Sequence, residues 1–123
     1  MKLFFASDIH GSALYCRQML NRYREEKAGK LILLGDILYH GPRNPFPDGY
    51  SPREVSAMLN EVSSEILCVR GNCDSEVDQM VLDFPIMAEY AVLYLEGRMV
   101  YITHGHILNE FDPTNLKKGD ILI

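Results

Sequence analysis

Five short polar side chains follow four apolar segments of this chain, and each is of a type that binds metal ions. They are Asp8, His10, Asp36, Asn72 and His104. Together with the nearby His106, they offer carboxylate and amide oxygens and imidazole nitrogens, but no thiolate. Such a mixed donor set suits manganese, iron or zinc, with magnesium also possible. The residue types therefore predict a metal site.

A pair of metal ions held by this set would suit one kind of chemistry well, namely displacement at a phosphate. Two ions about 3.5–4 Å apart stabilise both the attacking and the departing oxygen, and they lower the pKa of a bound water to roughly 7. Asp36 lies in the middle of the set along the chain and is the natural bridging carboxylate. We therefore expect two divalent ions, with a metal-bound hydroxide as the nucleophile.

Each motif also has a simpler explanation as a turn. Asp-x-His at Asp8 is a common polar turn, and His-Gly-His at His104 could be a solvated loop. Gly-Asp at Asp36 and Gly-Asn at Asn72 are frequent turn pairs. The combination favours the metal site, because all four apolar segments end in residues that can bind metal.

The segments that carry these residues alternate between strand and helix patterns. Apolar runs predict strands at 2–7, 30–36, 65–72 and 120–123, and two more over 89–106 that turn at Glu96-Gly97. Helical spacing and end signals predict helices at 12–29, with Gly29 as its cap, from the capping box Ser51-Pro52-Arg53-Glu54 through Val62, at 75–85, and from Asp112-Pro113 to Gly119.

A βαβαβ opening followed by a hairpin predicts an α/β domain with a mixed sheet. Ligands of open α/β sheets bind at the carboxyl ends of the strands, and neighbouring strands lie about 4.8 Å apart. The intervening helices put these strand ends on the same edge. Short side chains from separate segments can therefore converge on one small volume.

Length, charge and cysteine content restrict the class of protein. The 123 residues correspond to one domain, residues 1–123. The net charge of −5 disfavours stable binding to nucleic acid, which requires a basic surface. Three cysteines without a C-x-x-C pattern, a short N-terminal apolar run and no segment of membrane-spanning length predict a cytoplasmic protein.

The order D-x-H, G-D, G-N-x-D and H-G-H resembles the calcineurin-like metallophosphoesterase superfamily. Over essentially the whole chain, the sequence is similar to the small bacterial YfcE-like phosphodiesterases within it. The stretches GDILYHGPRNPFPDGY and VRGNCDSEVDQM match that group beyond the metal motifs. The resemblance implies an α/β fold, a β-sandwich flanked by helices, and a dinuclear centre that often holds manganese. It also implies hydrolysis of phosphodiester bonds in a small substrate.

The resemblance further implies a role for each residue of the set. Two ligand groups would share Asp36 as the bridge: Asp8 and His10 for the first ion, and Asn72 and His104 for the second. Asp74 would orient the site without binding metal, a role that such neighbouring groups commonly fill.

Cys73 stands where most of the superfamily has a histidine that assists the leaving group, so the general acid remains open. His40 and His106 are candidates for it, and Arg70 is a candidate for stabilising charge. Cys73 itself could bind metal as a thiolate, although a small buried residue is the simpler interpretation.

Arg43 and Asn44 belong to a stretch of thirteen residues with three prolines, which predicts an ordered loop. The two side chains could contact the phosphate of a substrate. Alternatively, the loop could be a structural lid or a contact between copies of the chain.

The superfamily completes its metal site with a Gly-His-x-His turn, and the 123 residues contain none. The final residues, GDILI, lead us to expect a C-terminally truncated protein with three protein ligands for each ion. An unpaired strand edge would then favour a homo-oligomer. The alternative to an enzyme is an inactive metal-binding or protein-interaction scaffold of the same fold, like the retromer subunit. A flavodoxin-like nucleotide binder is disfavoured, because no glycine-rich phosphate loop opens a helix.

Overall fold

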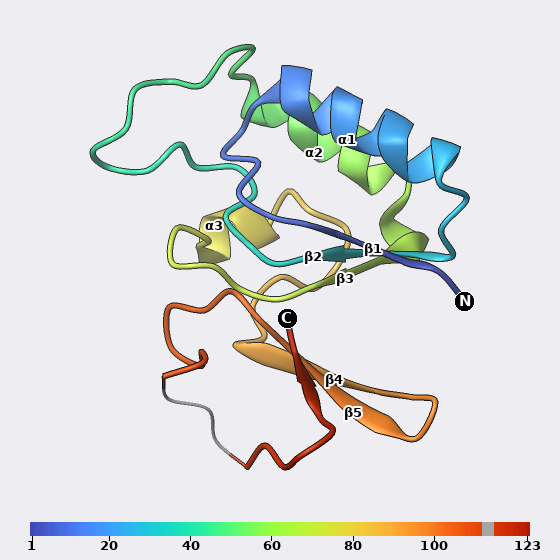
Figure 1. Cartoon of the computed structure of the whole chain (residues 1–123). Coiled ribbons are helices and arrows are strands. Elements are labelled where there is room, and N and C mark those ends of the chain that lie inside the picture. Colours follow the sequence, from blue (N-terminus) through green and yellow to red (C-terminus); the bar gives the residue numbers. More distant parts are fainter. Residues whose placement is uncertain (112–114) are drawn as a thin grey trace.

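A computed structural model describes residues 1–111 and 115–123 and contains two three-stranded sheets (Figure 1). The first sheet is parallel, in the order β1(Leu3–Ala6), β2(Lys30–Leu33) and β3(Ile66–Cys68). The carboxyl ends of all three strands therefore meet at one edge, as the alternation of strands and helices predicts.

The second sheet is formed by a hairpin and a short added strand. β4(Tyr90–Leu95) pairs antiparallel with β5(Arg98–Thr103), and β6(Ile121–Leu122) lies parallel to β5. Glu96 and Gly97 have φ angles of 50° and 78°, which is the geometry of a tight hairpin turn. The predicted hairpin and final strand are thereby confirmed.

The strand order predicts one mixed sheet containing the hairpin, and this is wrong: the hairpin packs against the face of the first sheet, as the β-sandwich implied by the resemblance requires. Buried side chains of the two sheets meet between them: Ile32, Val69, Val100 and Ile102. The opposite face of the first sheet is covered by α1(Ala13–Glu25) and α2(Pro52–Asn60) (Figure 1). The first sheet is consequently buried on both faces.

Helix ends differ from the predicted ones for local reasons. α1 ends at Glu25, and Lys27, with φ of 52°, takes the left-handed position that we expected at Gly29. Ser51 caps α2 by accepting a hydrogen bond from the Glu54 amide, with Pro52 in the first turn. The segment predicted as a helix over 75–85 keeps a single turn, α3(Glu76–Gln79), and a 3-10 turn at Ser63–Glu65 precedes β3.

The helix predicted from Asp112-Pro113 to Gly119 begins outside the described residues. The described part of that segment, 115–119, is not helical. Among the helices that the structure describes, none has the length and apolar character needed to cross a membrane.

Candidate metal centre

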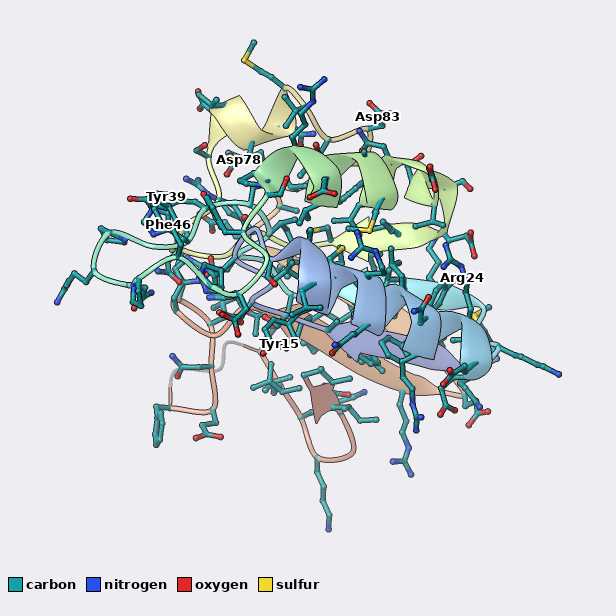
Figure 2. All side chains as sticks on the ribbon, turned by 90° about the horizontal axis from the view of Figure 1, so that it is seen from above. Tyr15, Arg24, Tyr39, Phe46, Asp78 and Asp83 are labelled. Carbon is teal, nitrogen blue, oxygen red and sulfur yellow. The ribbon has the colours of Figure 1, made fainter. Side chains whose placement is uncertain are left out.

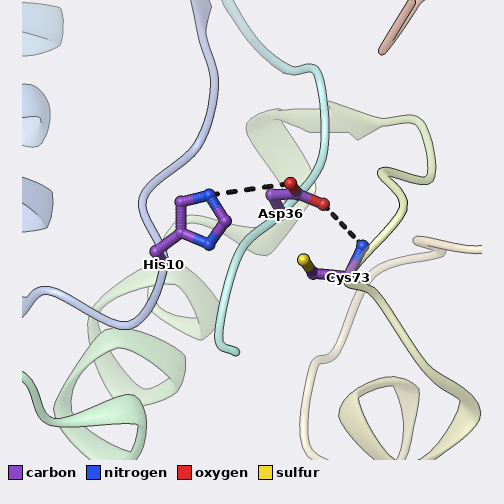
Figure 3. Close-up of side chains that lie close together, drawn as sticks. All are labelled: His10, Asp36 and Cys73. Atoms are coloured by element: carbon purple, nitrogen blue, oxygen red, sulfur yellow. Dashed lines mark hydrogen bonds and ion pairs between the residues drawn. The ribbon is translucent and has the colours of Figure 1, made fainter. Parts of the chain in front are cut away.

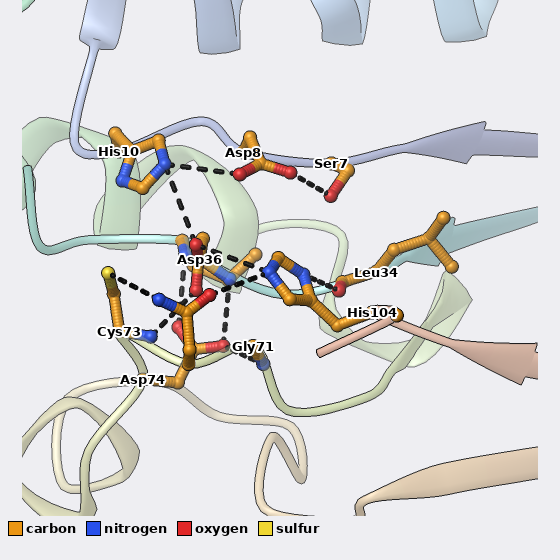
Figure 4. A network of polar contacts seen from close by, with 12 residues as sticks. Ser7, Asp8, His10, Leu34, Asp36, Gly71, Cys73, Asp74 and His104 are labelled. Carbon is orange, nitrogen blue, oxygen red and sulfur yellow. Dashed lines mark hydrogen bonds and ion pairs between the residues drawn. The ribbon is translucent and has the colours of Figure 1, made fainter. Parts of the chain in front are cut away.

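Three loops meet at the carboxyl edge of the first sheet, where their polar side chains form a network (Figure 4). Backbone hydrogen bonds hold the loops together. The Asp8 amide donates to the Gly35 carbonyl at 3.0 Å, and the His10 amide donates to the Asp36 carbonyl at 2.9 Å. From the third loop, the Cys73 amide donates to Asp36 Oδ1 at 2.8 Å. The relative position of the loops is therefore set by main-chain contacts rather than by side-chain packing alone.

Glycines permit this close approach. A Cβ atom added to Gly35 would collide with the backbone of Gly71, and one added to Gly71 would collide with the carboxylate and amide of Asp36. Gly35 also has a φ of 103°, which side chains rarely adopt. The Gly-Asp and Gly-Asn pairs are therefore turns and part of the site at once, so the two interpretations of these motifs do not compete.

Three of the five predicted ligands have left-handed backbone conformations. The φ angles are 58° for Asp8, 49° for His10 and 57° for Asp36. Such a conformation costs about 1–2 kcal/mol for a residue with a side chain, and it persists only where the surroundings enforce it. Here the inter-loop hydrogen bonds enforce it, and strain of this kind concentrates at functional sites.

Asp74 is the buried acceptor at the centre of this arrangement. Its side chain accepts hydrogen bonds from the amides of Asp36 at 2.8 Å, Ile37 at 3.0 Å and Gly71 at 2.7 Å. The residue is 2% exposed. A carboxylate in this position ties the second and third loops together, and the role of Asp74 in orienting a metal site stays a prediction.

The donor atoms of the predicted ligands lie within a few ångströms of one another. His10 Nε2 is 3.2 Å from Asp8 Oδ1 and 3.6 Å from Asp36 Oδ2. His104 Nε2 is 3.4 Å from the same Asp36 oxygen and 2.9 Å from Asn72 Oδ1. Donors that each lie about 2.0–2.2 Å from a common ion are separated by roughly 3–3.5 Å. The spacing around Asp36 therefore suits metal binding.

The imidazoles are oriented for metal binding by backbone carbonyls. Nδ1 of His10 lies 2.7 Å from the Tyr39 carbonyl, and Nδ1 of His104 lies 2.7 Å from the Leu34 carbonyl. A carbonyl can only accept, so each Nδ1 must carry the proton and each Nε2 presents its lone pair to the cluster. This pattern is usual for metal-binding histidines.

The surroundings of His10 change its pKa in two opposite directions. Burial lowers its pKa, but the hydrogen bond to the Tyr39 carbonyl and the charges of Asp36 and Asp8 outweigh burial, so the pKa is raised above 6.5. Asp36 is 3% exposed, whereas the Asp8 side chain is half exposed. Asp8 also accepts a hydrogen bond from the Ser7 hydroxyl. The cluster is thus open to solvent on the Asp8 side and closed around Asp36.

Two sets of metal-binding groups overlap in Asp36. One is Asp8, Asp36 and His104, and the other is His10, Asp36 and Cys73, with donor atoms within 4.8 Å of one another (Figure 3). Burial and the neighbouring Asp36 raise the pKa of the Cys73 thiol. Cys73 is only partly buried, so the interpretation of it as a small buried residue is wrong in that respect.

The other predicted site residues lie around this cluster at varying distance. The ring of His106 is 5.3 Å from the ring of His104, and His106 is exposed. Arg70 is tied to the third loop, because its Nε donates to the Asp74 carbonyl at 3.2 Å. His40 packs among aromatic rings of the proline-containing loop, and its Nδ1 lies 3.2 Å from the Asn44 carbonyl.

Arg43 and Asn44 differ in their surroundings. Asn44 Nδ2 donates to the His40 carbonyl at 3.2 Å and would meet a Cβ atom added to Gly41, so Asn44 stabilises its own loop. Arg43 is exposed. Sequence reasoning missed the carbonyls of Leu34 and Tyr39, for which a sequence contains no signal, because every residue has a carbonyl.

The comparisons with known proteins define the class of this fold and site. The sequence profile of the calcineurin-like phosphoesterase superfamily domain matches residues 1–120, and the chain belongs to that superfamily. Among individual proteins, it is similar to the phosphodiesterase YfcE of Escherichia coli strain K12, with 47% identity over 123 residues. The match covers 100% of this chain and 67% of that protein, and the YfcE of E. coli O157:H7 gives the same values.

A solved structure of E. coli YfcE, described as a phosphoesterase, has the same fold. The TM-score is 0.95 at 48% sequence identity, and the match covers 98% of this chain and 66% of that one. The predicted metallophosphoesterase type of α/β fold is thereby confirmed. The chain spans about two thirds of the length of these relatives.

Proposed function

We propose that this domain hydrolyses phosphodiester bonds with the help of two divalent metal ions, manganese being the first to test. The observation that carries the proposal is the position of Asp36 Oδ2, which lies 3.6 Å from one imidazole and 3.4 Å from another. Oδ1 of the same carboxylate is occupied by the Cys73 amide. One oxygen is thus left facing two histidines from different segments, as a shared ligand requires.

The distances around Asp36 support two ligand groups in this proposal. Asp8, His10 and Asp36 would hold one ion, and Asp36, Asn72 and His104 the other. Ions bound in this way supply a nucleophile from water at neutral pH and stabilise negative charge on a phosphate. The Tyr39 and Leu34 carbonyls hold Nδ1 of His10 and His104, so Nε2 is the nitrogen that each ring would offer to an ion.

For the proton that the leaving group needs, we propose His106 rather than His40. His106 is exposed beside the ring of His104, so its imidazole can reach a substrate at the cluster. His40 is packed between the rings of Tyr39, Phe46 and Tyr50. Arg70 lies close to the third loop through its bond to the Asp74 carbonyl and could offset phosphate charge.

As substrate we propose a small phosphodiester in the cytoplasm. The net charge of −5 provides no general attraction for a polyanion, so a phosphate must be bound locally. The same charge argues against stable nucleic-acid binding. The relatives named YfcE are phosphodiesterases by name, which supports the reaction type but not a particular substrate.

The test is hydrolysis of bis-p-nitrophenyl phosphate with added Mn²⁺, combined with metal analysis of the purified chain. We expect two ions per chain, and Asp36→Asn should reduce activity by at least roughly 100-fold, because loss of mere supporting contacts already costs about 10–100-fold. Asp83→Asn, a change of an exposed carboxylate on another segment, is the matched control. Activity that survives both Asp36→Asn and a chelator would contradict the proposal.

The alternative is a metal-binding scaffold without catalysis. Among the residues identified here, each ion would have three protein ligands. Stoichiometric Mn²⁺ binding without hydrolysis would support the scaffold. His104→Ala should then lower the metal content from two ions to one, whichever of the two functions holds.

A further inference from the structure

A groove lies between α2, α3 and the loop that follows β2, and it is lined mainly by apolar and aromatic side chains. We call it the α2–α3 groove. Its volume is about 370 Å³, within the usual range for small-molecule sites. The lining residues that matter here are Tyr39, Tyr50, Ser56, Val77, Asp78 and Val81. Val77 and Val81 are 70% and 50% exposed, so the groove presents apolar surface to solvent.

The groove lies beside a second hollow that is lined by residues of the candidate metal centre. This hollow of about 510 Å³ is lined by Asn72 and Cys73, and it shares Tyr39 and Asp78 with the α2–α3 groove. Figure 2 shows Tyr39 and Asp78 at the same end of the molecule. Tyr39 is also the residue whose carbonyl orients His10. A molecule held by its phosphate at the metal centre would therefore have the groove beside it.

The aromatic wall of the groove is held in place by further rings. Tyr39 lies 4.8 Å from the ring of His40, which in turn lies 5.5 Å from Tyr50. Phe46 lies 4.6 Å from His40 and 4.7 Å from Tyr50. These separations are typical of aromatic pairs. Because the rings support one another, little side-chain entropy is lost when a ligand packs against them.

We propose that the α2–α3 groove binds a planar aromatic group carried by one ester arm of the phosphodiester substrate. The inference rests on the proposed function, since it presumes a phosphate at the metal centre. The class of substrate is a diester with an aryl group or a nucleobase, both of which offer a flat apolar face to the tyrosines. Stacking on an aromatic side chain strengthens binding roughly tenfold or more for each ring.

The test compares methyl phosphate, phenyl phosphate and adenosine 5′-monophosphate as inhibitors of bis-p-nitrophenyl phosphate hydrolysis by the Mn²⁺-loaded chain. We expect phenyl phosphate to bind at least about tenfold more tightly than methyl phosphate. Tyr39→Ala, which removes the wall, and Ser56→Trp, which fills the groove, should each abolish that difference. Tyr94→Ala removes a 70% exposed tyrosine from the distant hairpin and should leave the ratio unchanged.

A direct measurement separates this inference from the proposed function. In NMR spectra, the methyl groups of Val77 and Val81 should shift with phenyl phosphate but not with methyl phosphate, and this readout does not depend on turnover. Shifts without any hydrolysis would support the groove and contradict the enzyme. Hydrolysis with equal inhibition by the phenyl and methyl compounds would overturn the groove. A Tyr39-dependent gain for adenosine 5′-monophosphate as well would assign the occupant as a nucleobase, and a gain for phenyl phosphate alone would assign it as an aryl group.

Discussion

The two sheets contribute to the candidate metal centre in different ways. The loops after β1, β2 and β3 supply four of the five proposed ligands, and hydrogen bonds among their main chains and to the Asp74 carboxylate hold them. The second sheet supplies only His104, through side-chain contacts with Leu34 and Asn72. The first sheet therefore sets the geometry of the site, and the second sheet completes it when it packs against the first and brings His104 to the cluster.

The first sheet also has the larger buried core. Side chains of α1, α2 and the first sheet form the larger buried cluster. The cluster between the sheets contains four buried residues, and the outer side of β4 exposes Tyr90 and Tyr94. Substitutions in the loops and core of the first sheet should therefore lower both stability and metal affinity. Substitutions in the second sheet should lower stability without changing metal affinity.

The largest effect is expected from Asp74→Ala. This change leaves the amides of Asp36, Ile37 and Gly71 without their acceptor in a buried place. Each unsatisfied group costs about 1–3 kcal/mol, so the free energy of unfolding should fall by at least about 3 kcal/mol. Urea unfolding followed by circular dichroism measures it, and Mn²⁺ affinity should fall with it.

Asp83→Ala is the control for this experiment, because Asp83 is an exposed carboxylate of the same region and its loss should change stability by less than about 0.5 kcal/mol. Asp74→Asn keeps one acceptor oxygen and should give an intermediate loss. If Asp74→Ala were as stable as Asp83→Ala, the loops would be held by something other than this carboxylate.

A smaller effect, confined to the site, is expected from Gly71→Ala. Gly71 does not have a left-handed backbone, so its φ angle permits alanine, but the added Cβ would collide with the carboxylate and the amide of Asp36. Mn²⁺ affinity, measured by calorimetry, should fall about 10–100-fold, as for other disturbances of ligand orientation.

Gly97→Ala in the hairpin turn provides the opposite case. Gly97 has a φ of 78° and no atom within 4 Å of an added Cβ, so alanine meets strain without collision. We expect a stability loss of about 1 kcal/mol and unchanged Mn²⁺ affinity. A fall in Mn²⁺ affinity in Gly97→Ala comparable to that in Gly71→Ala would show that the hairpin does more than dock His104.

The sequence could predict the strands, the hairpin turn and the cluster of ligand types, because period, turn residues and side-chain chemistry are local. The strand pattern alone could not predict that the hairpin stacks on the first sheet, since that depends on how Ile32 and Ile102 pack across the molecule, and only the family resemblance implied a sandwich. The left-handed conformations of Asp8 and Asp36 were equally hidden, because the hydrogen bonds that enforce them join separate loops.

The smallest effect concerns pH. It tests whether the carboxylates and the carbonyl around His10 raise its pKa in the folded chain. Its raised pKa means that the folded chain favours the protonated imidazole. In a metal-free chain, His10 therefore contributes stability that is fully present below pH 6.5 and is lost as pH rises through the raised value. A metal ion requires the neutral imidazole, so Mn²⁺ affinity should instead fall as pH decreases.

Urea unfolding with a chelator at pH 6 and pH 8, for the unmodified chain and for His10→Asn, isolates the His10 contribution. The difference in unfolding free energy between the two chains should be larger at pH 6, whereas calorimetry with Mn²⁺ should show tighter binding at pH 8. Opposite pH dependences in the two experiments would indicate one imidazole that exchanges a proton for a metal ion. If the difference in unfolding free energy did not change with pH, then Asp8, Asp36 and the Tyr39 carbonyl would not raise the pKa of His10 in solution. The loops of the first sheet would then be held together less firmly than their hydrogen bonds indicate.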